Sequence, residues 1–190
     1  MRRQAIQVLT VQVFALLAVC LPGLAAAAEI TQRKANIYSE GVRVSGTVYA
    51  PPGADGKLLP AIIMSHGWGG TAAMLTPQAK RFANAGYFVL VIDYRGWGES
   101  DARLVRDEQS ATDKNARRDL REVVHPLDQA TDIFNAIHWL QGETGVDVNR
   151  IGVWGTSFSG GLAAYVAARD SRVKAIVAQT AWFGDSIAAM

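Results

Sequence analysis

The sequence contains very little cysteine and histidine, and each shortage excludes a kind of chemistry. Cys20 is the only cysteine among the 190 residues, and it lies in an apolar N-terminal stretch. From residue 29 onwards the chain therefore has no means of forming a disulfide, a thiolate metal site or a cysteine nucleophile, and we expect no metal. The three histidines, His66, His125 and His138, leave few candidates for a general base.

An excess of charge of either sign is also lacking. The chain has 19 basic and 17 acidic residues, and no basic run occurs. Without the two arginines of residues 1–28, 17 basic residues balance 17 acidic ones. A neutral protein is only weakly attracted to nucleic acid or to an anionic membrane surface, so we expect neither as a partner. The sequence leaves the oligomeric state open.

The first 28 residues have the pattern of a secretory signal peptide. Two arginines precede the largely apolar stretch Ile6–Leu21, and a Pro-Gly pair then leads to a run of alanines. This order predicts cleavage just before Glu29 and a secreted or periplasmic mature protein without stable membrane insertion. A membrane anchor is the alternative, but the apolar stretch is short and interrupted by polar residues. A lipid-modified Cys20 would require a small residue at position 19, which is valine.

Residues 29–190 are enough for one domain, and strand patterns alternate with helix patterns along them. We expect strands at Asn36–Tyr38, Val42–Ala50, Leu58–Met64, Tyr87–Ile92, Ile151–Trp154 and Val173–Ala178. We expect helices from an N-cap at Thr76 to Gly86, from Pro126 to Gly142 with Leu127, Ala130, Phe134, Ile137 and Leu140 on one face, and at Leu162–Ala168. A polar segment at residues 95–118 is expected to overhang the site. The alternation predicts an α/β fold, a mostly parallel sheet with helices on both faces, whose site lies at the carboxyl ends of the strands.

The stretch Ile151–Gly161, IGVWGTSFSGG, puts a serine between a predicted strand and a predicted helix. A sharp strand-to-helix turn needs small flanking residues, and Gly155 and Ser159 flank Ser157. Because such a turn is strained and exposes the hydroxyl group, we predict that Ser157 is a nucleophile. The amide of Phe158 would then face an oxyanion formed on attack. Two alternatives remain, an incidental serine at a helix start and Ser159 as the nucleophile.

Two more loops follow predicted strands, HGWGG at residues 66–70 and DYRGWGES at residues 93–100. Glycines in the first loop let the backbone approach a ligand, so we predict that the Trp68 amide is the second oxyanion donor. His66 and Gly67 would shape this loop, for which a flexible glycine turn is the alternative. The second loop is predicted to shape the site without taking part in the chemistry. Neither loop completes the G-x-G-x-x-G pattern of a dinucleotide site, and we expect no cofactor.

Together the three loops resemble the α/β-hydrolase superfamily, and the resemblance extends from about Ile30 to the end of the chain. GTSFSGG is similar to its nucleophile elbow, HGWGG to its oxyanion loop, and DYRGWGESD to the turn after its fourth strand. The details are most similar to the Xaa-Pro dipeptidyl-peptidase-like and dienelactone-hydrolase-like branches. The resemblance implies a Ser–Asp/Glu–His triad with Ser157 as nucleophile, and Trp68 and Phe158 as backbone donors.

The chain departs from this family pattern after Ser157. The family places its acid and then its histidine after the serine, whereas here only Asp170 and Asp185 follow as acids, and no histidine follows. Asp185 is the candidate triad acid because it lies just beyond the sixth predicted strand. We expect His66 to brace the oxyanion loop rather than to act as the base. Residues 29–190 are therefore expected to be the N-terminal portion of an α/β-hydrolase domain, truncated after the sixth strand.

The predicted function is that of an exported serine hydrolase. It would cleave an ester or peptide bond of a small-molecule or peptide substrate through an acyl-Ser157 intermediate. The alternative is a non-catalytic protein of the same fold that acts as a binding or scaffold module. A longer reading frame that carries an acid and a histidine would favour the enzyme.

Overall fold

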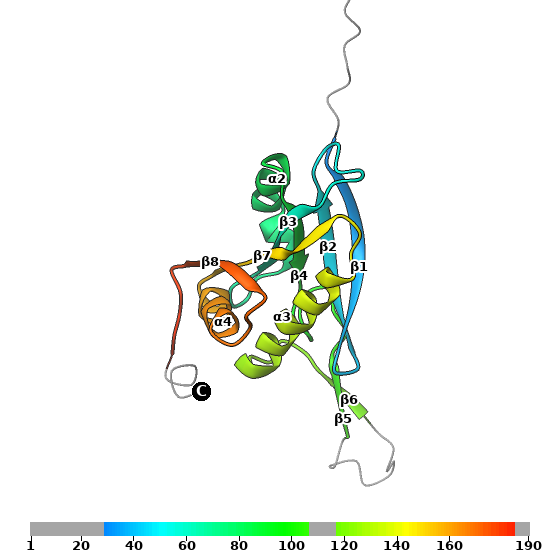
Figure 1. The fold of residues 1–190 in the computed structure, drawn as a ribbon. Coiled ribbons are helices and arrows are strands. Elements are labelled where there is room, and N and C mark those ends of the chain that lie inside the picture. The colour runs from blue at the N-terminus through cyan, green and yellow to red at the C-terminus, as the bar shows by residue number, and fades with distance from the viewer. Residues whose placement is uncertain (1–28, 107–116, 185–190) are drawn as a thin grey trace, which may run out of the picture.

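The computed structural model describes residues 29–106 and 117–184, in which a six-stranded main sheet has helices on both faces (Figure 1). The strands, in spatial order, are β1 (Thr31–Ser39), β2 (Val42–Ala50), β4 (Phe88–Ile92), β3 (Leu59–Ser65), β7 (Val146–Thr156) and β8 (Val173–Gln179). β4, β3, β7 and β8 run parallel, whereas β2 is antiparallel to both of its neighbours. The predicted α/β class with a mostly parallel sheet is confirmed. The predicted signal peptide lies outside the described residues.

Helices cover the two faces of this sheet unequally. The helical elements are η1 (Ala72–Leu75), α2 (Thr76–Asn84), α3 (Pro126–Gln141) and α4 (Phe158–Ala167). Figure 1 shows α2 on one side of the sheet and α3 and α4 on the other. Along β4 the buried side chains alternate, since Leu90 and Ile92 join the core under α3 and α4 while Val89 and Val91 join the core under α2. Burial on both faces explains the continuous apolar run of this strand. Among the described residues, no helix combines the length and hydropathy needed to cross a bilayer.

Two expected details of the helices are wrong. Thr76 is the first residue of α2 rather than its N-cap, because η1 runs directly into the helix and the Thr76 hydroxyl instead meets the Tyr49 hydroxyl at 3.1 Å. Leu127 is exposed, because Gln129 takes the buried place in the first turn of α3. The Gln129 amide group accepts a hydrogen bond from the His125 N–H and donates one to the Val123 carbonyl. The buried face of α3 therefore begins with a polar residue.

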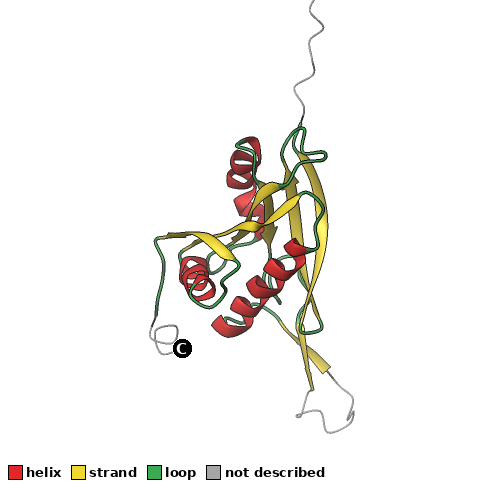
Figure 2. Ribbon diagram, viewed as in Figure 1, coloured by secondary structure: helices red, strands yellow, loops and turns green. Residues whose placement is uncertain are grey.

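The polar segment after β4 contains a second, small sheet that the sequence did not predict. Its strands are β5 (Arg103–Arg106) and β6 (Arg117–Leu120), which pair antiparallel. Figure 2 shows this pair apart from the main sheet. Because charged residues interrupt both strands, their sequences have no apolar alternation that would predict them.

A buried ion pair fixes the turn after β4 to two other elements. Arg95 and Asp132 are both buried, and their side chains meet with Nε–Oδ1 at 2.9 Å and Nη2–Oδ1 at 2.7 Å. The Arg95 N–H donates to the second Asp132 oxygen, and Nη2 also donates to the Ser39 hydroxyl. Both carboxylate oxygens and most guanidinium donors are thus satisfied, which a buried ion pair requires. The pair joins the turn after β4 to α3 and to the end of β1.

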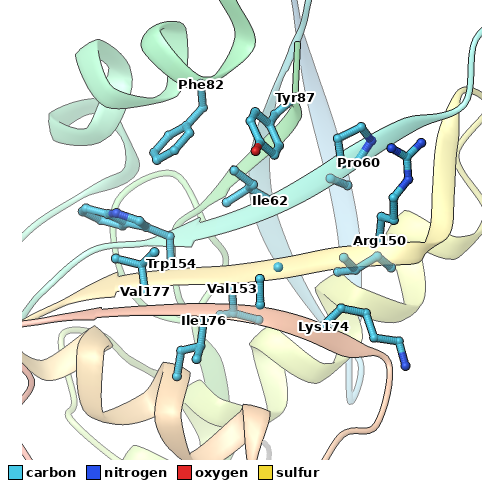
Figure 3. A pocket seen from close by; sticks show the side chains of 14 residues that line it. Pro60, Ile62, Phe82, Tyr87, Arg150, Val153, Trp154, Lys174, Ile176 and Val177 are labelled. Atoms are coloured by element: carbon cyan, nitrogen blue, oxygen red, sulfur yellow. The ribbon is translucent and has the colours of Figure 1, made fainter. Parts of the chain in front are cut away.

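An apolar groove of about 340 Å³ lies on the α2 side of the sheet (Figure 3). Side chains from α2, β3, β7 and β8 line it, among them Ile62, Phe82, Trp154 and Val177. Ile176 and Val177 belong to β8, which pairs only with β7 among the described residues and whose side chains are largely exposed. The groove and the β8 edge together form an unusually apolar surface.

The β8 edge predicts that a protein consisting of residues 29–190 self-associates. An exposed strand with apolar side chains offers unpaired backbone groups to another chain, and a charge on that strand opposes the pairing. We expect Ile176→Lys to raise the monomer fraction in sedimentation velocity. Leu58→Lys is the matched control, because Leu58 is an exposed apolar residue outside this edge. A monomeric unsubstituted protein with cooperative unfolding would contradict the prediction.

Candidate active site

Ser157 lies at the junction of β7 and α4 and has a strained backbone, with φ at 56° and ψ at −122°. Its side chain is exposed. The Ser157 N–H donates to the Gln179 carbonyl at 2.9 Å, and the Ser157 carbonyl accepts from the amides of Gly160 at 2.9 Å and Trp182 at 3.0 Å. Hydrogen bonds on both sides of the residue hold a conformation that costs a non-glycine residue about 1–3 kcal/mol.

Two glycines beside Ser157 allow close approaches of the backbone. A Cβ atom at Gly155 would overlap the carbonyl and side chain of Ser159, so the turn into α4 requires glycine there. A Cβ atom at Gly160 would lie 2.9 Å from the Cα of Ala181 and 3.1 Å from the carbonyl oxygen of Gln179. Gly160 therefore admits the segment after β8, which is a role that the sequence did not indicate.

Ser159 has a structural role in the elbow. It is fully buried, and its hydroxyl donates to the Ser65 carbonyl at 2.8 Å and accepts from the Ser65 hydroxyl at 2.6 Å. These bonds fasten the first turn of α4 to the end of β3. Burial and two hydrogen bonds exclude the alternative in which Ser159 is the nucleophile, since a substrate carbonyl has no access to its oxygen.

The HGWGG loop passes directly against Ser157. A Cβ atom at Gly67 would lie 3.3 Å from the Ser157 Cβ and 3.2 Å from the Thr156 carbonyl oxygen. The amides of Trp68 and Phe158 follow these two contacting residues, and neither has a hydrogen-bond partner within residues 29–106 and 117–184. Two free amides on adjacent segments beside a serine hydroxyl are what an oxyanion hole requires.

His66 is buried, and its ring is held by contacts with Gly67 and Tyr94. Its Nδ1–H donates to the Gly67 carbonyl at 2.9 Å, and its ring packs edge-on against Tyr94 with centroids 4.7 Å apart. Burial lowers the pKa of His66, although the hydrogen bond to Gly67 and the charge of Asp93 oppose this shift. A neutral imidazole with this tautomer braces the loop that carries the Trp68 amide.

Asp93 organises the loop that follows β4. Its Oδ1 accepts from the Ala72 amide at 2.6 Å and its Oδ2 from the Glu99 amide at 3.1 Å. Gly98 has φ at +50°, and a Cβ atom there would overlap the Asp93 carboxylate. The loop thus wraps closely around this side chain and connects it to the end of the HGWGG loop. All of these contacts are structural, in agreement with the expected role of residues 93–100.

No acid and no base join Ser157 among the described residues. His125 is the N-cap residue of α3 and lies 3.3 Å from the Asp128 carboxylate, while His138 is exposed on the same helix. Asp170 binds Arg172, whose hydrogen bonds lower the pKa of the Asp170 carboxyl. Asp185, the candidate triad acid, lies outside the described residues. Within residues 29–106 and 117–184, the structure therefore brings the Gly67–Trp68 segment and the start of α4 to Ser157, without an acid or a base beside them.

The sequence profile of the X-Pro dipeptidyl-peptidase (S15) family matches residues 40–186. The chain belongs to this family. S15 membership agrees with the predicted Xaa-Pro dipeptidyl-peptidase-like branch of the α/β-hydrolase superfamily. The match includes all three loops around Ser157.

Individual relatives support the same placement. The quorum-quenching protein AidA of Acinetobacter baumannii is 34% identical over 74% of this chain and 41% of its own length. Thiohydrolase aneE of Aspergillus aculeatus is 32% identical over 73% of this chain and 37% of its own length. The crystal structure of the α/β hydrolase GrgF from a Penicillium species superposes with a TM-score of 0.64, at 26% identity, over 77% of this chain and 44% of that one. The chain thus spans about two fifths of the length of these relatives.

Gly67→Ala is expected to slow ester hydrolysis by this S15-family protein roughly 10²-fold, on the scale of losing one oxyanion donor. The added methyl group would push the HGWGG loop away from Ser157 and displace the Trp68 amide. Initial rates with p-nitrophenyl acetate measure the effect. Gly142→Ala is the matched control, because Gly142, like Gly67, has no positive φ, and an added Cβ there would make only an ordinary contact of 3.5 Å with the Trp139 carbonyl oxygen. An equal loss of rate in both variants would attribute the effect to folding.

Proposed function

We propose that this chain supplies the nucleophile and the oxyanion hole of an exported serine hydrolase that cleaves ester or peptide bonds. The observation that carries the proposal is the exposed Ser157 at positive φ, with Gly67 packed against its Cβ. S15-family membership supports a hydrolase, and the names of aneE and GrgF describe a thiohydrolase and an α/β hydrolase.

In the proposed reaction the Ser157 hydroxyl oxygen attacks the substrate carbonyl carbon. The carbonyl π electrons move to oxygen, and the amides of Trp68 and Phe158 stabilise the resulting oxyanion. The serine proton passes to a base and then to the leaving group, whose departure leaves an acyl-Ser157 ester. Water hydrolyses that ester in a second, equivalent step. We assign the base and the triad acid to residues outside the described part of the protein.

The test is acylation by p-nitrophenyl acetate. We expect the full chain to release p-nitrophenol and to gain one acetyl group on the peptide that contains Ser157, as measured by mass spectrometry after rapid acid quench. Absence of both signals would support the alternative, a non-catalytic binding or scaffold module. A parallel assay with an Xaa-Pro anilide separates esterase from peptidase activity.

Export is a further part of the proposal, based on the N-terminal sequence. We expect the mature protein to begin near Glu29 and to occur in the periplasm or the medium. Intact-mass measurement of protein from these fractions checks the position of cleavage. A retained Met1, or a lipid on Cys20, would contradict it.

A further inference from the structure

Three aromatic rings form a continuous row beside Ser157. The Phe158 ring, only 3% exposed, lies between the rings of Trp68 and Trp182, with centroid separations of 6.5 Å and 6.0 Å. The outer rings are far more accessible, since Trp68 is 67% exposed and Trp182 42% exposed. Exposed tryptophans held by ordered neighbours are typical of sites that bind a ligand.

The backbone fixes both outer tryptophans relative to the reacting atoms. Trp182 donates its own amide hydrogen to the Ser157 carbonyl at 3.0 Å. Trp68 follows Gly67, which packs against the Ser157 Cβ, and its amide is a proposed oxyanion donor. Both tryptophans therefore belong to segments that contact Ser157, and their rings lie against the ring of the next residue, Phe158.

The three segments that surround Ser157 carry no formal charge. Residues 67–79, 151–168 and 175–184 contain no Asp, Glu, Lys or Arg. Beside the HGWGG loop, His66 is buried and burial lowers its pKa, while the buried Asp93 carboxylate is held by the amides of Ala72 and Glu99. Such surroundings favour an uncharged group, because a charged one would lose its hydration without gaining a partner.

We propose that Trp68 and Trp182 bind a neutral aromatic acyl group of the substrate, so that the preferred substrates are esters of uncharged aromatic acids. The proposal rests on the proposed function, because it names the substrate of the same site. A flat ring attached to the scissile carbonyl carbon meets the exposed tryptophan faces by offset or edge-to-face contact. An Xaa-Pro dipeptide is less suited to these segments, since its α-ammonium group carries a charge.

Binding can be tested without catalysis in the full-length Ser157→Ala protein. Quenching of tryptophan emission by benzamide, which is neutral and is not cleaved, gives the dissociation constant, with acetamide for comparison. We expect benzamide to bind more tightly than acetamide, and Trp182→Ala to weaken benzamide binding roughly tenfold. Trp182→Phe should restore most of the affinity. Trp139→Phe is the matched control, because this tryptophan lies on α3 beside Arg33.

Equal binding of benzamide and acetamide, or unchanged benzamide binding in Trp182→Ala, would overturn the proposal. The failure of the proposed function has a different signature. Acylation of Ser157 without a preference for benzamide contradicts only the aromatic site, whereas preferential benzamide binding without any acylation contradicts only the hydrolase.

Turnover assigns the ring to the acyl side of the ester. With p-nitrophenyl benzoate and p-nitrophenyl acetate, which share a leaving group, we expect Trp182→Ala to lower the ratio of their kcat/KM values roughly tenfold. An equal loss with both substrates, which leaves the ratio unchanged, would mean that the tryptophans bind the aromatic leaving group, and the acyl assignment would be wrong.

Discussion

Replacing Ser157 with alanine in the complete enzyme, with its acid and base, is expected to lower the rate of ester hydrolysis by roughly 10⁴- to 10⁶-fold, the scale observed when the nucleophile of a triad is removed. The expected loss is large because no other described hydroxyl replaces Ser157. Ser159, two residues away, is fully buried and donates its proton to the Ser65 carbonyl. The backbone donors of Trp68 and Phe158 remain in the variant, so a small residual rate over water is expected.

Initial rates and labelling with a fluorophosphonate probe measure this effect independently. The probe should react with Ser157 in the unsubstituted protein and give no product with Ser157→Ala. Ser171→Ala is the matched control, because Ser171 is an exposed serine beyond the end of α4. Its rate and labelling should equal those of the unsubstituted protein. Labelling that persists in Ser157→Ala would exclude this residue as the nucleophile.

The second large effect is expected on stability, where Arg95→Met should lower the free energy of unfolding by about 3–5 kcal/mol. The substitution leaves the Asp132 carboxylate buried without its guanidinium partner, and methionine has no donor to replace the bonds to Asp132 and Ser39. Chemical denaturation followed by circular dichroism gives the free energy. The comparison requires an unchanged denaturant slope, since a changed slope would indicate an altered unfolded state.

Two further variants separate the buried charge from the general effect of losing an arginine. Arg95→Met combined with Asp132→Leu removes both charges and should recover much of the lost stability. Arg103→Met breaks the largely exposed ion pair with Asp128 and should cost no more than about 1 kcal/mol. If Arg95→Met and Arg103→Met cost the same, the Arg95–Asp132 pair is not the link between the turn and α3 that its contacts indicate.

Much of the fold follows from local sequence patterns. The turn at residues 39–41 and the following Pro-Pro-Gly delimit β2 at Val42–Ala50, as expected. The apolar runs of β3, β4 and β8 were predicted to within one residue at each end. The helix α4 begins at Phe158, four residues earlier than expected. Ser159, Gly160 and Gly161 have low helix propensity, which favoured a later start. Packing of this turn against β3 and β8 overrides that propensity.

Other features depend on contacts that no local pattern encodes. β5 and β6 pair across a polar segment without apolar alternation. Gly160 is required by the approach of residues 179–181, which the spacing of the elbow motif alone does not reveal. The row formed by Trp68, Phe158 and Trp182 combines residues from three separate segments. The positions of Ser157 and Gly67 could be predicted, because a serine between small residues after a strand and a glycine-rich loop are both visible in the local sequence.

The two amides of the proposed oxyanion hole are positioned by contacts of very different sequence separation. The backbone of Ser157 is fixed by bonds to Gln179 and Trp182, which lie 22 and 25 residues along the chain, so this half forms by closing a short loop. Trp68 precedes Phe158 by 90 residues and reaches it only when β3 pairs with β7. Such a distant contact carries a larger loop-closure cost and is therefore expected to form later in folding. During refolding, activity should therefore return only after helix content has recovered, because oxyanion stabilisation requires β3 to pair with β7.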